Sequence, residues 1–278
     1  MRGGIIYYVW QMEMPENYKE SNRDSWNQRV EPHLKSDLYD LEGFKKGKTS
    51  LNTIELELLG DVTGKSVLHL QCHFGQDSLS LARMGATVVG VDLSDKAIDT
   101  ARQLNSELGL NAEFVCCDVY DSPNHINQQF DIVFTTYGTI GWLPDMDKWA
   151  GVIAHFLKPG GKLVFVEFHP VVWMFDDDFN TVAYNYFNAD TIVETSEGTY
   201  ADRSAPIKTE TVSWNHNLAE VMTALISKGL RIELFKEYDY SPYNVFRDTE
   251  QVDERQYRLK KMGNKLPMVY AIEATISE

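Results

Sequence analysis

Short apolar runs recur through the middle of the chain and are separated by segments of mixed polarity. The runs cover residues 66–70, 87–91, 112–117, 130–136 and 162–168. Their length, and apolar character at nearly every position, predicts strands that are buried on both faces. Such strands are typical of a parallel sheet with helices packed on either side.

Helical spacing of apolar residues appears between these runs. It predicts helices over 76–84 and 94–108, the second with Ser94 as its N-terminal cap. A third helix carries its buried face on Trp149, Ile153, Phe156 and Leu157. Residues 158–161 read Lys-Pro-Gly-Gly, which predicts that this helix stops there.

The alternation of strands and helices breaks down after residue 168. Residues 170–213 have no long amphipathic helix but contain alternating runs at 191–194 and 208–214, so we expect a β-rich insertion. A helix over 218–228 follows, and then strands over 231–240 and 268–276. Because no good crossover helix separates these last two strands, they are expected to form an antiparallel hairpin.

This organisation predicts one α/β domain over residues 1–278, a length that can bury a sizeable core. We expect four parts within it, namely an N-terminal helical lid (1–60), a ligand-binding core (61–169), the β-rich insertion (170–213), and a C-terminal helix with a hairpin (214–278).

Residues 66–92 carry the most specific signal. They predict a strand, a turn, a helix and a second strand that ends on Asp92, which is the first half of a nucleoside-binding unit. A carboxylate in that position accepts hydrogen bonds from both ribose hydroxyls. The turn holds Gln71, His73 and Gly75 where a dinucleotide-binding fingerprint has three glycines. Two side chains crowd this loop, so it is a poor phosphate cradle.

The same stretch, LHLQCHFG, resembles the first motif of class I S-adenosylmethionine (SAM)-dependent methyltransferases, and it is similar to that of a bacterial subgroup of them. The usual motif is an acid followed by Gly-x-Gly-x-Gly. Here His69 takes the place of the acid, and Gln71 and His73 take the places of glycines. The resemblance runs from about Trp26 to the C-terminus. It implies a Rossmann-like seven-stranded sheet whose last strand is antiparallel, and SAM as the cofactor.

The resemblance also implies roles for individual residues. Asp92 would bind the ribose, Asp118 would accept a hydrogen bond from the adenine amino group, and Gly75 would allow the backbone to approach the ligand. The expected cofactor-binding residues are Gln71, His73, Gly75, Asp92, Leu93, Asp118, Val119, Thr136 and Tyr137.

No catalytic residue can be assigned from the sequence. SAM carries an already activated methyl group, so the protein contributes mainly alignment, and it needs a base only if the acceptor loses a proton. His73, Tyr137 and His169 are the candidates for such a base, and Glu167 is also expected to border the acceptor. Each of these side chains could instead hold a hydrogen bond.

Two further segments are expected near the ligand. Residues 26–44 are aromatic and polar, and they form either a helix folded over SAM or an ordinary packing helix. Aromatic residues in the insertion 170–213 and in an expected loop over 243–267 suggest an acceptor pocket. They also fit a small core of their own or a homodimer contact. The aromatic residues concerned are Trp173, Phe175, Tyr184, Tyr186, Tyr243 and Phe246.

Charge and composition narrow the partners. The net charge of −15 disfavours nucleic acid and anionic membrane surfaces. It favours a small-molecule acceptor, as does the absence of an Asn/Asp-Pro-Pro-Tyr motif. Cys72, Cys116 and Cys117 lack metal-ligand spacing, so we expect reduced core thiols in a cytoplasmic protein and no metal. The apolar run at 5–10 is too short to span a membrane, and Met12 or Met14 are alternative starts.

Two other functions stay open. An NAD-type oxidoreductase would share the strand-ending acid, but it conflicts with the missing glycines and with the closing hairpin. A SAM-binding or nucleoside-binding module without catalysis would fit the altered motif. Binding of SAM or of NAD distinguishes a methyltransferase from an NAD-type oxidoreductase, and turnover distinguishes an enzyme from a binding module.

Overall fold

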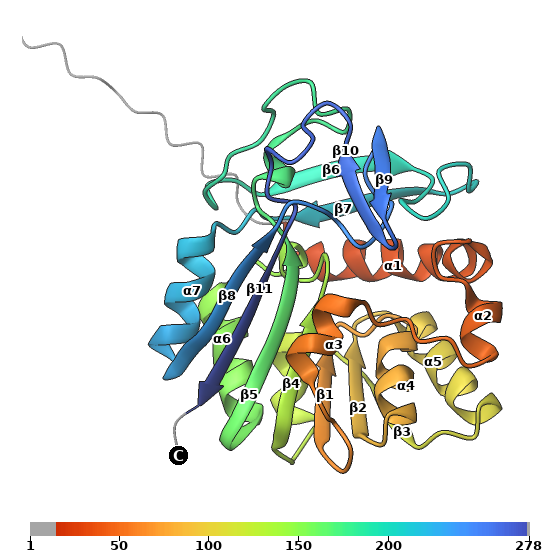
Figure 1. The fold of residues 1–278 in the computed structure, drawn as a ribbon, viewed down its shortest axis with the longest axis vertical. Coiled ribbons are helices and arrows are strands. Elements are labelled where there is room, and N and C mark those ends of the chain that lie inside the picture. Colours follow the sequence, from red (N-terminus) through yellow and green to blue (C-terminus); the bar gives the residue numbers. More distant parts are fainter. Residues whose placement is uncertain (1–14, 277–278) are drawn as a thin grey trace, which may run out of the picture.

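The computed structural model describes residues 15–276, so the apolar run at 5–10, Met12 and Met14 lie outside the described residues. A seven-stranded sheet in the order β3-β2-β1-β4-β5-β11-β8 forms its centre (Figure 1). The strands are β1 (Ser66–Leu70), β2 (Thr87–Asp92), β3 (Ala112–Cys116), β4 (Phe130–Thr136), β5 (Leu157–Phe168), β8 (Leu230–Tyr238) and β11 (Val269–Ile276). β11 runs antiparallel to both β5 and β8, whereas β1 to β5 pair in parallel. The predicted sheet, with only its last strand antiparallel, is confirmed.

Helices cover both faces of this sheet. On one side lie α3 (Thr53–Leu59), α4 (Gln76–Arg83) and α5 (Asp95–Glu107), and on the other lie α6 (Met146–Phe156) and α7 (Leu218–Ser227). Successive residues of a strand point to opposite faces of the sheet and pack in different hydrophobic clusters. Leu68 packs in the cluster on the face covered by α6 and α7, and Val67 packs in the cluster on the face covered by α3. Ser94 caps α5 as expected, because its Oγ accepts a hydrogen bond from the Ala97 amide.

The structure corrects three details of the sequence reading. β5 begins at Leu157, so the Lys-Pro-Gly-Gly segment lies inside this strand, where the pairing with β4 shifts register between Phe130 and Ile132. The segment 243–267 is more than a loop, because it contains the hairpin of β9 (Thr249–Asp253) and β10 (Gln256–Leu259). Cys116, expected in the core, is exposed, because it is the last residue of the edge strand β3.

A second layer lies across the carboxyl ends of the parallel strands. Figure 1 shows α1 (Tyr18–Lys35) between the sheet and the pair β6 (Ile192–Glu197) and β7 (Lys208–Ser213). Two hydrogen bonds join Asn22 of α1 to the backbone of Val212, at 2.8 and 2.9 Å. The expected β-rich insertion is confirmed, and it packs on the N-terminal helix.

Shorter elements complete the chain. They are α2 (Leu41–Lys45), η1 (Val119–Asn124), η2 (Ile140–Trp142) and η3 (Val172–Met174). Among residues 15–276 no helix is both long enough and apolar enough to cross a bilayer.

Candidate functional site

A cavity of 1210 Å³ opens where the parallel strands β1, β2 and β4 end. This is the edge at which open α/β sheets bind their ligands. The loops after these strands form its floor, and α1, the insertion and the segment after β8 form its roof. Small-molecule sites usually measure roughly 300–1,000 Å³. The cavity is therefore large enough for a cofactor and a second molecule together.

The turn after β1 has a glycine-like backbone with few glycines. Gln71, His73 and Gly75 have φ angles of 56°, 51° and 79°, in the left-handed region. For residues other than glycine this conformation costs about 1–3 kcal/mol, and such strain is found mostly at functional sites. A Cβ on Gly75 would lie 2.7 Å from the Phe114 ring and 3.0 Å from the Ala101 Cβ. Core packing therefore requires a glycine here, and Gly75 also lines the cavity.

Asp92 lies at the end of β2 on the cavity floor. The His73 amide donates to its Oδ2 at 2.8 Å, and the Ser94 amide donates to its Oδ1 at 2.8 Å. Each oxygen keeps a lone pair for a ligand. Burial raises the pKa of Asp92 to about 6, and the two amide hydrogen bonds oppose that shift. The carboxylate is thus fixed in place and ionised at neutral pH.

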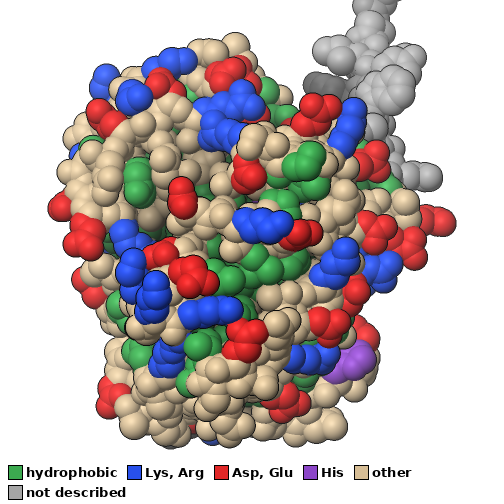
Figure 2. All heavy atoms as spheres, turned by 90° about the vertical axis from the view of Figure 1, so that its right-hand side faces the viewer, with side chains coloured by type: hydrophobic (Ala, Val, Ile, Leu, Met, Phe, Trp, Pro, Cys, Tyr) green, Lys and Arg blue, Asp and Glu red, His purple; other side chains and the backbone are tan. Residues whose placement is uncertain are grey.

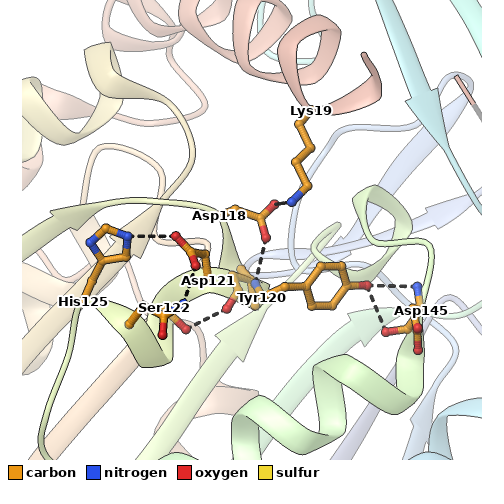
Figure 3. A network of polar contacts seen from close by, with 9 residues as sticks. Lys19, Asp118, Tyr120, Asp121, Ser122, His125 and Asp145 are labelled. Carbon is orange, nitrogen blue, oxygen red and sulfur yellow. Dashed lines mark hydrogen bonds and ion pairs between the residues drawn. The ribbon is translucent and has the colours of Figure 1, made fainter. Parts of the chain in front are cut away.

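Both carboxylate oxygens of Asp118 contact other residues of the chain (Figure 3). Its Oδ1 accepts a hydrogen bond from the Tyr120 amide at 2.8 Å, and its Oδ2 forms an ion pair with Lys19 of α1 at 3.3 Å. Lys19 and Val119 line the cavity, whereas Asp118 does not. The structure therefore does not bring Asp118 to the ligand-facing surface as the resemblance implied.

Tyr137 follows β4, lines the cavity and has a φ angle of 44°. Its hydroxyl donates to Glu55 Oε2 at 3.0 Å. Glu55 is fully buried in α3, and this burial raises its pKa to about 7. The sequence analysis missed Glu55. Its one signal is the capping box that it forms with Asn52, which indicates only a helix end.

Glu167 is not available to act as a base. Its oxygens accept hydrogen bonds from the amides of Gly138, Thr139, Ile140 and Phe168. It lines the cavity but serves to hold the loop after β4. Glu167 therefore borders the cavity as expected, and of its two possible roles the structure favours that of holding hydrogen bonds.

His169 lies outside the cavity. Its Nε2 contacts Glu237 Oε1 at 2.9 Å, and its Nδ1 accepts a hydrogen bond from the Val171 amide at 3.2 Å. Only 3% of the residue is exposed, and it does not line the cavity. Of the three candidate bases, the structure brings His73 and Tyr137 to the cavity, whereas His169 lies directly after β5 and contacts Glu237 of β8.

His73 faces the roof. Its Nε2 lies 3.0 Å from Nδ1 of His33 in α1. Burial lowers the pKa of both imidazoles, that of His33 to about 3. His69 lines the cavity and contacts Ser78 Oγ at 2.8 Å, and burial lowers its pKa to about 3. All three histidines are therefore neutral at physiological pH, and His69 cannot replace the charge of the motif's usual acid.

Arg29 is a second residue that the sequence analysis missed. It lies on α1, is 8% exposed and lines the cavity. Its guanidinium lies 5.2 Å from the Trp26 ring and 5.8 Å from the Trp142 ring. Its Nε has no hydrogen-bond partner, and it forms no ion pair within residues 15–276. A buried cation without a protein counter-ion is a suitable site for an anionic ligand group.

Aromatic rings of the floor and of the roof meet at one end of the cavity. Tyr137 and Tyr243 have ring centroids 5.1 Å apart, and Phe168 and Phe246 have centroids 5.2 Å apart. The expected aromatic residues that line the cavity are Trp173, Phe175, Tyr184, Tyr243 and Phe246, whereas Tyr186 does not. This end can therefore hold a planar or apolar molecule.

The outer surface shows no concentration of one charge where it is viewed. Figure 2 faces the right-hand side of Figure 1, and it shows acidic and basic side chains interspersed. Among residues 15–276 no group of three or more His, Cys, Asp and Glu is placed to hold a metal ion.

Comparison with known proteins agrees with this geometry. Residues 67–161, which contain the turn, Asp92 and β4, match the family described as "Methyltransferase domain". The sheet order with one antiparallel last strand is the arrangement that the resemblance implied. Residues 67–161 are therefore similar to a methyltransferase domain, and the sheet around them has the class I methyltransferase fold.

The curated relatives that the chain matches include ubiquinone biosynthesis O-methyltransferases. The protein from Salmonella arizonae is 34% identical over 131 residues, which are 46% of this chain and 54% of the relative. The protein from Coxiella burnetii is 33% identical over 135 residues, which are 48% of this chain and 57% of the relative. The chain therefore spans about half the length of the curated relatives it matches.

Solved structures of methyltransferases share the fold of this chain. A putative SAM-dependent methyltransferase from Listeria monocytogenes superposes with a TM-score of 0.54 at 19% identity, covering 81% of this chain and 99% of the other. The DhpI–SAH complex superposes with a TM-score of 0.55 at 17% identity, covering 95% of this chain and 99% of the other. The magnesium protoporphyrin IX methyltransferase of Synechocystis with bound SAM superposes with a TM-score of 0.53 at 15% identity, covering 96% of this chain and 100% of the other.

Proposed function

We propose that this chain binds SAM in the cavity and transfers its methyl group to a small-molecule acceptor. One observation carries the proposal: a fixed, ionised Asp92 and a buried, unpaired Arg29 line the same cavity. SAM has ribose hydroxyls, which need an acceptor such as Asp92. It also has a carboxylate, which needs a cation such as Arg29. The residues present therefore fit the cofactor.

The nucleoside end would lie against the loops after β2 and β3. Asp92 would accept hydrogen bonds from the ribose, and Leu93 and Val119 would contact the base through apolar surface. The ion pair between Asp118 and Lys19 leaves less room for Asp118 to bind adenine directly. We therefore expect Asp92 to contribute more binding energy than Asp118.

The amino-acid end would lie between the turn after β1, the loop after β4 and α1. Arg29 would pair with the carboxylate in a charge-assisted hydrogen bond, which is stronger than a neutral one. Gln71, His73, Gly75, Thr136 and Tyr137 line this region, though Gly75 serves the core packing.

The acceptor would occupy the aromatic end of the cavity. SAM supplies a methyl group activated by its sulfonium. The protein's part is then to align the acceptor and to exclude water, which the rings of Tyr137, Tyr243 and Phe246 can do. The acidic chain and the names of its relatives support a small-molecule acceptor.

Calorimetric titration tests the proposal. SAM and S-adenosylhomocysteine are expected to bind once per chain, and NAD is not expected to bind. Release of S-adenosylhomocysteine should then appear with at least one member of a set of small phenols, amines, thiols and carboxylic acids. Tight binding of NAD without binding of SAM would overturn the proposal. Binding without any turnover would favour a SAM-binding module over an enzyme.

A further inference from the structure

Two residues of the turn after β1 keep side chains where the backbone favours glycine. Gln71 and His73 both adopt left-handed φ angles, of 56° and 51°. Glycine would adopt them without strain. The side chains therefore need a compensating role, and their contacts indicate which one.

Gln71 connects two loops of the cavity floor. Its Nε2 donates a hydrogen bond to the carbonyl oxygen of Thr139 at 2.8 Å. Thr139 belongs to the loop after β4, and its amide donates to Glu167 at 2.7 Å. Gln71 thus fastens the turn after β1 to a loop that β5 already holds through Glu167. Its Oε1 is buried and has no partner among residues 15–276.

His73 connects the same turn to the roof. Because both imidazoles of the His33–His73 pair stay neutral, one ring donates and the other accepts in the 3.0 Å hydrogen bond. The His73 ring also packs against Trp26, with centroids 5.2 Å apart. This contact joins the turn to α1 without placing a charge in the cavity.

The fastened part of α1 is the part that carries Arg29. His33 lies four residues after Arg29, so the two side chains lie on one face of α1, one turn apart. Trp26 lies three residues before Arg29, on the same face, and its ring contacts the guanidinium. Holding His33 and Trp26 therefore also fixes the position of Arg29.

We propose that Gln71 and His73 are positioning residues for the amino-acid end of SAM. Through Thr139 and His33 they set the space between the turn, the loop after β4 and Arg29. This inference rests on the proposed function. It also explains why a strained turn is retained: the side chains position groups that glycines would leave free.

The test compares two ligands that share a nucleoside thioether. S-Adenosylhomocysteine has the amino-acid end, and 5′-methylthioadenosine lacks it. In the variants Gln71→Gly and His73→Gly we expect the affinity for S-adenosylhomocysteine to fall roughly tenfold, as for loss of a hydrogen bond in a buried site. The affinity for 5′-methylthioadenosine should change by less than about threefold, because its contacts lie at Asp92.

Further variants separate the hydrogen bonds from the backbone strain. Gln71→Ala removes the hydrogen bond to Thr139 but keeps the backbone strain, so it should lower the affinity for S-adenosylhomocysteine as much as Gln71→Gly does. His33→Phe breaks the bond to His73 from the side of α1 and should reproduce the effect of His73→Gly. Glu31→Gln is the matched control on α1, because Glu31 is exposed and pairs only with Lys35. It should leave both affinities unchanged.

The outcomes are distinguishable. Equal weakening of both ligands, or no weakening of either, in variants that keep the wild-type unfolding temperature would overturn the positioning role. If the wild-type chain binds neither ligand, the proposed function fails and the inference fails with it. A loss confined to S-adenosylhomocysteine supports it, whether it comes from the turn or from α1.

Discussion

The floor and the roof of the cavity are built in different ways. In the floor, backbone amides hold two carboxylates: those of His73 and Ser94 hold Asp92, and a row of amides after β4 holds Glu167. In the roof, side chains far apart in sequence hold each other. The hydroxyls of Tyr39 and Tyr200 lie 2.6 Å apart.

This difference has a functional meaning. Backbone contacts within short loops tolerate many changes of side chain, so the floor can keep one geometry for a constant ligand. Contacts between side chains change with each substitution, so the roof can be adapted to a particular acceptor. We therefore expect floor substitutions to alter cofactor binding and substitutions of roof aromatics to alter the choice of acceptor.

Glu55 gives the largest expected effect, at the junction of floor and roof. Its folded-state pKa of about 7 lies above the usual 4.5, so the fold favours the protonated form. Below about pH 4.5 Glu55 is protonated in both the folded and the unfolded chain, so its ionisation does not reduce stability. Between about pH 4.5 and about pH 7 the unfolded chain loses this proton first, and the free energy of unfolding falls by about 3 kcal/mol in all. Glu55→Gln should raise the unfolding free energy by up to that amount near pH 8 and change it little near pH 5.

Urea unfolding at a series of pH values measures this effect. Glu57→Gln is a suitable control, because Glu57 lies on the same helix but is exposed. A Glu55→Gln variant with the same pH dependence as wild type would contradict the burial argument.

Asp92→Ala breaks the floor itself. Removing a charged acceptor of ribose hydrogen bonds should weaken SAM binding by roughly 2–3 kcal/mol, measured by calorimetry. The chain should still fold, because Asp92 lies at a strand end beside the cavity. Unchanged SAM affinity in a folded variant would remove Asp92 from the site.

Arg29→Met tests the roof with a side chain of similar length. Loss of the charge should weaken the binding of SAM and of S-adenosylhomocysteine by about 1.5–2 kcal/mol, as expected for a hydrogen bond to a charged group. Because 5′-methylthioadenosine has no carboxylate, its affinity should stay close to that of wild type. Equal losses for all three ligands would indicate a structural role for Arg29 instead.

Acid should affect the floor more than the roof. As the pH falls through about 6, Asp92 gains a proton and loses its charge. SAM affinity should therefore decrease about tenfold between pH 7 and about pH 5. The cavity histidines have pKa values lowered by burial, so they stay neutral over this range. Asp92→Asn should bind weakly with little pH dependence, and a wild-type-like slope in that variant would assign the effect elsewhere.

The floor could largely be read from the sequence. The bounds of β1 and β4 match the predicted runs residue by residue, because continuous apolar strands leave little ambiguity. Asp92 and Asp118 carry the same signal, an acid directly after a buried strand. Only the structure separates them, since Lys19 pairs with Asp118 from almost a hundred residues away.

The roof could be read only in outline. The strands of the insertion were predictable from alternation, but the position of Arg29 was not. α1 is polar along most of its length, so one arginine among many charged residues gives no sign that it is buried. Nothing in the sequence indicated that Glu55 is buried either, because a capping box with Asn52 already explains a glutamate at this position of a helix. Both residues become functional candidates only through contacts with distant segments.

A crystal structure of the chain with S-adenosylhomocysteine tests the central claim most directly. We expect both ribose hydroxyls within hydrogen-bond distance of the Asp92 carboxylate, with its amide contacts to His73 and Ser94 retained. We also expect the ligand carboxylate against Arg29 and the sulfur directed toward Tyr137 and the aromatic end. A ligand bound with its ribose away from Asp92, or with its carboxylate in solvent while Arg29 stays unpaired, would contradict it.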